Sequence, residues 1–112
     1  MKNFATKAER TKAVKLLKNA RERIEQHRND WVCTAISNSA YDLSLSGGGF
    51  KFANRIAERL RRNISKSLEG HAYVDHWLAQ KKNIPARDLT KDAVRAYRLR
   101  WIDSMIAQLE AM

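Results

Sequence analysis

The stretch FKFANRIAERLRRNISKSL, residues 50–68, decides the fold, because its apolar residues recur with the period of an α-helix. At about 100° per residue, positions three or four apart share one face. The apolar face consists of Ala53, Ile56, Ala57, Leu60, Ile64 and Leu68. A helix with so continuous an apolar face must bury it against other elements. The sequence therefore predicts a helix from about Phe50 to Leu68 that packs inside a helical bundle.

The opposite face of this segment is basic. Five cations fall within about 40° of its centre at 100° per residue: Lys51, Arg55, Arg59, Arg62 and Lys66. Glu58 is the only acidic residue near the edge of the row. Solvated helix faces usually mix charges to gain i, i+4 ion pairs, and this row forgoes that gain. Because an exposed row of cations can follow a phosphate backbone, we predict an anion- or nucleic-acid-binding site rather than a plain solvated face.

Two further helices are predicted ahead of this segment. Thr6 and Glu9 have the spacing of a capping box, which begins a helix from about Lys7 to about His27. Its predicted core face is Ala13, Leu16, Leu17, Ala20 and Ile24. The segment WVCTAISNSAYDL, residues 31–43, predicts a second helix. Its predicted core face is Val32, Cys33, Ile36, Ala40 and Leu43.

The remainder of the chain also has helical periodicity. Gly70 is placed to end the basic helix. The segment AYVDHWLAQKK, residues 72–82, predicts a short helix. The segment NIPARDLT, residues 83–90, predicts a loop around the only proline. Thr90 is the expected cap of a last helix that continues to the C-terminus. Its core stripe is expected to be Val94, Tyr97, Trp101, Met105 and Leu109. We therefore predict one all-α domain, residues 1–112, built as a compact bundle of four to five helices.

Arg98 falls inside the apolar arc of the last helix, beside Trp101 and Ile102. An arginine at such a position either extends its stem along the edge of the core or anchors a buried ion pair. Both interpretations give Arg98 a structural role.

Charge narrows the class of partner. The 112 residues include 22 Lys and Arg against 12 Asp and Glu, which gives a formal net charge of +10. An excess of this size favours nucleic acid, nucleotides, acidic protein surfaces or anionic lipid as partners. Apolar runs are shorter than the roughly 18 residues of a membrane span, and the N-terminus lacks the apolar stretch of a secretory signal. The expected location is the cytoplasm, with no membrane partner.

The cysteine, histidine and glycine residues of the sequence do not form the motifs of a catalytic, metal or nucleotide site. The single cysteine, Cys33, excludes an intramolecular disulfide and a CxxC zinc site, and its apolar neighbours predict a buried, inert thiol. His71 and His76 lie on different sides of one helix, so we expect no metal and no cofactor. The glycines at 47–49 match neither the P-loop nor the dinucleotide fingerprint and are interpreted as a joint between helices, with an anion site as the alternative. An enzyme is not expected.

Four segments resemble a loose family of small proteins that bacteriophages and prophages encode: AVKLLKNARERI (13–24), WVCTAI (31–36), HWLA (76–79) and RLRWIDSMIAQLEAM (98–112). The resemblance covers most of the chain. It implies an all-helical fold and an accessory role in the host cell, and it implies no reaction. The triple glycine and the dense arginines of residues 50–68 are not part of that pattern.

Three functions are compatible with this resemblance and with the charge. The first is a nucleic-acid binder that uses the basic row, without sequence preference because the row contains no Asn or Gln. The second is an inhibitor that docks on a host defence complex, as anti-CRISPR-type proteins do. The third is a sponge that sequesters a small nucleotide signal. The oligomeric state stays open, because an apolar stripe can serve a core or a partner equally well.

Overall fold

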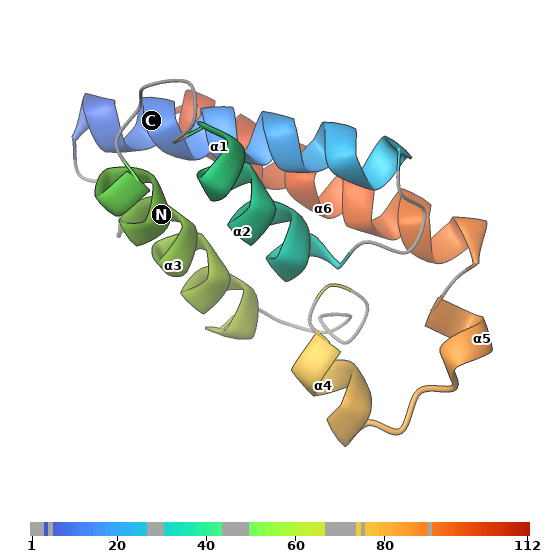
Figure 1. Cartoon of the computed structure of the whole chain (residues 1–112). Coiled ribbons are helices and arrows are strands. Elements are labelled where there is room, and N and C mark those ends of the chain that lie inside the picture. Colours follow the sequence, from blue (N-terminus) through green and yellow to red (C-terminus); the bar gives the residue numbers. More distant parts are fainter. Residues whose placement is uncertain are drawn as a thin grey trace.

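The computed structural model describes residues 4, 6–26, 31–43, 50–66, 74, 76–89 and 91–112, apart from the side chains of residues 43, 50, 63–66, 76–78 and 86. Its helices are α1 (Lys7–Gln26), α2 (Val32–Leu43), α3 (Phe50–Lys66), α4 (His76–Lys81), α5 (Ala86–Leu89) and α6 (Asp92–Glu110). Figure 1 shows α1, α2, α3 and α6 packed together, with the short α4 and α5 beyond one end of this bundle. None of these ranges contains a strand, so the predicted all-α fold is confirmed.

Helix α1 is the element that holds the bundle together, because it packs against α2, α3 and α6. Its buried residues are the five that the sequence predicts. The capping box at its start is also confirmed: the Thr6 hydroxyl accepts the Glu9 N–H at 3.1 Å, and the Glu9 carboxylate accepts the Thr6 N–H at 3.1 Å. Each residue thus satisfies an amide that the first helical turn leaves unpaired.

The core lies where the four long helices meet. Its largest fully buried apolar side chains are Phe4, Leu16, Leu17, Ile24, Val32, Ile36, Ile56, Leu60, Ile102 and Leu109. Phe4 precedes α1 and was not predicted as a core residue. Its carbonyl accepts a hydrogen bond from Arg10 Nη1 at 3.1 Å, which ties the chain ahead of α1 back to the first turns of that helix.

Helix α4 is shorter than predicted, since its range is His76–Lys81. Its end is defined by Asn83, whose φ of 53° is left-handed. The Asn83 N–H donates to the Gln80 carbonyl at 3.1 Å, and the Ile84 N–H donates to the Ala79 carbonyl at 3.3 Å. These two bonds form a Schellman motif, in which asparagine takes the position more often held by glycine.

The predicted loop at residues 83–90 is wrong in its second half, where α5 forms. The Asp88 N–H donates to the Pro85 carbonyl at 2.9 Å, so the proline precedes a helical turn, a position that does not need its missing N–H. Helix α6 begins at Asp92, with Lys91 as an extended N-cap that makes no side-chain capping bond. The predicted cap Thr90 and the segments 44–49 and 67–73, which contain all four glycines, lie outside the described residues.

Helix α6 is rotated relative to the predicted stripe. Its buried residues are Val94, Arg98, Ile102, Met105 and Leu109, whereas Tyr97 and Trp101 are only half-buried. Arg98 is 1% exposed, so it lies within the core rather than at its edge. Its guanidinium carbon is 4.6 Å from the ring centroid of Trp31, the residue that precedes α2. This cation–π contact places the charged end of Arg98 against an aromatic ring inside the bundle.

The burial of α3 gives a direct test of the fold. Leu60 is fully buried in the core, and the substitution Leu60→Ala should lower the free energy of unfolding by about 2 to 5 kcal/mol, because it leaves a cavity. Urea denaturation followed by circular dichroism measures this loss. Lys82→Ala, at an exposed position after α4, is the matched control and should change stability by less than about 0.5 kcal/mol. A Leu60 variant as stable as the control would contradict the packing of α3.

Candidate nucleic-acid interface

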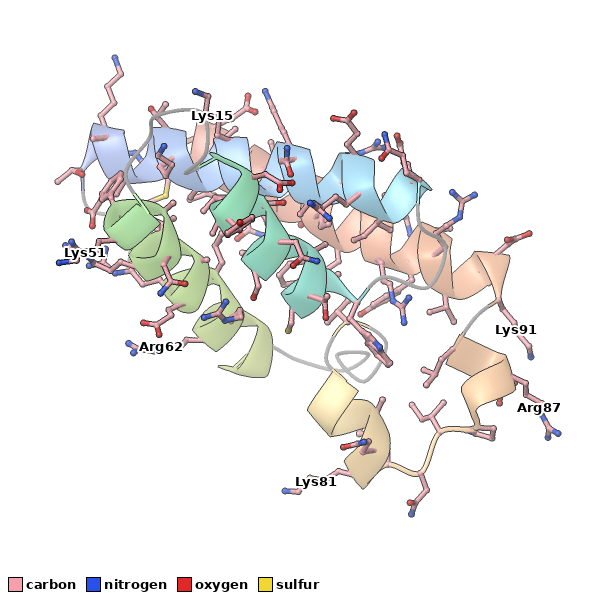
Figure 2. The ribbon with its side chains drawn as sticks, viewed as in Figure 1. Lys15, Lys51, Arg62, Lys81, Arg87 and Lys91 are labelled. Carbon is pink, nitrogen blue, oxygen red and sulfur yellow. The ribbon has the colours of Figure 1, made fainter. Side chains whose placement is uncertain are left out.

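The outer face of α3 presents three exposed cations. Burial of Ala53, Ile56, Ala57 and Leu60 against the bundle fixes the rotation of the helix about its axis. Lys51, Arg55 and Arg62 lie on the opposite side and are exposed. Figure 2 shows Lys51 and Arg62 projecting from α3 away from the other helices. These three residues, here called the α3 row, span about 17 Å along the helix at 1.5 Å per residue.

Arg59 does not belong to this exposed row, and its predicted exposure is wrong. The side chain is 28% exposed, and its Nη1 donates to Oε2 of Glu9, which is 17% exposed. Arg59 is displaced about 40° from Arg55 around the helix, which turns it toward α1. The ion pair therefore joins α3 to the first turn of α1.

The ion pair with Arg59 lowers the pKa of Glu9. The hydrogen bond from Arg59 is the main cause that lowers the pKa of the Glu9 carboxyl below its ordinary value, and the Thr6 amide lowers it further. Both bonds favour the charged carboxylate. Glu9 thus serves two elements at once, since it caps α1 and anchors α3.

Arg61 fixes the other flank of α3 and was not predicted as a functional or structural residue. Its Nη1 donates to the Ser37 hydroxyl of α2 at 2.6 Å. The same hydroxyl donates to the Cys33 carbonyl at 3.1 Å. In the sequence, Arg61 lies about 160° around the helix from Arg59 and about 100° from Arg62, which places it off the basic row. Its partner is visible only once α2 lies beside α3. Arg59 and Arg61 therefore hold α3 from both sides and leave its outer face fixed in orientation.

Carboxylates are scarce on the outer face of α3. Within the described part of that helix the only acidic residue is Glu58, which is exposed at the edge of the row. The ion pairs elsewhere join Lys18 to Glu110, Arg21 to Glu25 and Asp103, Arg23 to Asp42, and Lys91 to Asp88. None of these carboxylates is on α3, where the three cations of the α3 row stand against one carboxylate, that of Glu58. Lys66 continues the row in sequence, but its side chain lies outside the described part of the structure.

The structure brings no metal-ligating cluster together in the ranges given above: no three His, Cys, Asp or Glu side chains there could hold an ion. Cys33 is half-buried against the core rather than fully buried as predicted. In the same part of the chain, no helix has the length and apolar character needed to cross a membrane.

Comparisons of the chain with protein-family models, with curated proteins and with solved structures find no match.

The double role of Glu9 predicts a pH-dependent contribution to stability. A carboxyl whose pKa is lowered by folding stabilises the fold when the pH is above its unfolded pKa, and this contribution is lost as the pH falls through the folded pKa. Glu9→Gln should therefore be less stable than the natural chain at neutral pH, with a difference that shrinks at about pH 2. Urea midpoints at the two pH values measure it.

Glu22→Gln is the matched control for this experiment, because Glu22 lies on the same helix and accepts a hydrogen bond from Gln26 rather than from an arginine. Its stability difference should be smaller than that of Glu9→Gln at neutral pH. Equal losses for the two variants at neutral pH would show that the Glu9–Arg59 pair does not stabilise the fold.

Proposed function

We propose that this chain is a non-enzymatic accessory protein, of the kind that phages encode, which acts in the host cytoplasm by binding the phosphate backbone of nucleic acid. The observation that carries the proposal is the α3 row: Lys51, Arg55 and Arg62 are exposed on one face of a helix whose other face is buried. Backbone binding requires cations at intervals along a surface, and the row supplies three along about 17 Å.

The rigidity of α3 supports this proposal. Arg59 and Arg61 hold the helix to α1 and α2, so the row meets its ligand without first ordering the backbone. A fixed surface loses less conformational entropy on binding than a mobile one. The proposal thus assigns binding to the α3 row and the attachment of α3 to Arg59 and Arg61.

Sequence preference is not expected. Specific readout of bases uses bidentate contacts, such as those of Asn and Gln with adenine, from an element that enters a groove. The α3 row contains no Asn or Gln, and the proposal assigns its lysine and arginines to phosphates, contacts that position a protein without reading sequence. Three phosphate contacts would give a log–log salt slope on duplex DNA of about −3, which is small and typical of weak, sequence-independent binding.

Alanine substitutions in the α3 row test this function. Lys51→Ala, Arg55→Ala and Arg62→Ala should each flatten the salt slope by about one unit on duplex DNA, equally for unrelated sequences, because each removes one phosphate contact. Fluorescence anisotropy titrations with labelled duplexes at several salt concentrations measure the slope. Lys82→Ala is the matched control, since it removes an exposed cation outside the row.

Arg59→Ala separates binding from folding. Because Arg59 pairs with Glu9, this substitution should lower the urea midpoint while changing the salt slope less than Arg55→Ala does. Unchanged salt slopes for all three row variants would contradict the proposal.

The same titrations distinguish the two alternatives. An inhibitor that docks on a host defence complex would retain a host protein, bind free duplex poorly and depend on a few substitutions in a protein contact. A nucleotide sponge would gain thermal stability from short oligonucleotides or cyclic nucleotides and bind long duplex poorly. Either set of results would contradict the nucleic-acid function and support the corresponding alternative.

A further inference from the structure

A second basic surface lies on α1, separate from the α3 row. A hollow of about 440 Å³ lies between the outer side of α1 and the end of α6. Val14, Leu109 and Met112 contribute apolar surface to it, and four cations of α1 contribute its charge. Val14 is five residues after Glu9, which places it about 140° around α1 from the residue that faces α3. The hollow therefore lies on a different side of α1 from the side that packs against α3.

The lining cations follow one side of α1. Lys7, Lys15 and Lys18 are exposed, and they extend over about 17 Å at 1.5 Å per residue. Arg10, half-buried, is oriented by the bond from its Nη1 to the Phe4 carbonyl. Figure 2 shows Lys15 on α1, on another side of the bundle from Lys51 and Arg62 on α3. Lysine stems are apolar, so they can extend the apolar walls of the hollow while their ammonium groups remain in water.

The charge of the hollow is not balanced within its own lining. Among the described residues, Glu110 is the only one in this lining with a side-chain carboxylate, and its oxygen is 3.8 Å from Lys18 Nζ. Both side chains are more than half exposed, at 64% for Lys18 and 55% for Glu110, so this pair is weak. Four side-chain cations against one side-chain carboxylate leave a positive potential over an apolar floor.

We propose that this hollow binds a small free amphiphile that has one apolar chain and an anionic head group. Its volume lies in the range of about 300 to 1,000 Å³ that is typical of small-molecule sites. Val14, Leu109 and Met112 would contact the chain, and the lysines would contact the head group. A nucleotide fits less well, because the lining described here contains no aromatic side chain on which a base could stack.

Laurate, kept below its micelle concentration, is the probe. Isothermal calorimetry should show saturable binding at one site, and methyl NMR should show shifts at Val14, Leu109 and Met112. Acetate has the same head group without the chain, and dodecyltrimethylammonium has the same chain with the opposite charge. Both should bind at least about tenfold more weakly, since each lacks one half of the recognition.

Two variants test the lining. Lys15→Glu with Lys18→Glu should weaken laurate binding by about tenfold, because two attractions become repulsions. Met112→Asp, at an exposed position beyond α6, should weaken it without loss of helix content. Lys81→Glu with Lys82→Glu is the matched control: it makes the same change in net charge on another part of the surface, and it should leave the affinity within about twofold.

The proposal would be overturned if laurate did not bind, if dodecyltrimethylammonium bound equally well, or if the α1 and α4 double variants behaved alike. Binding to vesicles of anionic lipid without binding to free laurate would also overturn it, because the ligand would then be a membrane surface. Methyl shifts confined to residues outside the hollow would do the same. Duplex titrations report on the α3 row independently of all these outcomes.

Discussion

The arrangement of the bundle depends on the buried face of α1, which packs against α2, α3 and α6. In the part of the chain that the structure describes, the ion pairs that join one helix to another also lie along α1. Glu9 joins α1 to α3, Asp42 of α2 pairs with Arg23, and α6 supplies Asp103 and Glu110. Each helix that packs on α1 thus has an ion pair at the seam. In a chain with 22 Lys and Arg against 12 Asp and Glu, carboxylates used at seams cannot neutralise outer faces.

The arginines of α3 fall into two groups, those that contact neighbouring helices and those that are exposed. Arg59 and Arg61 reach sideways to Glu9 of α1 and Ser37 of α2, whereas Arg55 and Arg62 are exposed on the outer face. Partly buried pairs at a seam are shielded from salt more than exposed charges are. High salt should therefore weaken ligand contacts of the outer face before it loosens α3, so binding and folding respond to salt at different concentrations.

The sequence predicted most of the fold because helical periodicity is local: the core face of α1, its capping box and the helical character of residues 50–66 follow from residues a few positions apart. Contacts between distant residues could not be read in this way. The burial of Arg59 was missed because its partner is 50 positions away. The rotation of α6 was missed because it brings Arg98 against Trp31, a residue 67 positions away in the sequence. Of the five predicted site residues, Arg59 pairs with Glu9 between two helices. The side chain of Lys66 lies outside the described part of the structure.

The most direct test of this account is NMR observation of the arginine Nε–Hε groups of the isotopically labelled protein during titration with duplex DNA. The account predicts that Arg55 and Arg62 shift progressively with added duplex. Arg59 and Arg61 should keep the positions that they have in the free protein, because Glu9 and Ser37 hold them. Shifts of Arg59 as large as those of Arg55, or shifts restricted to arginines outside α3, would contradict it.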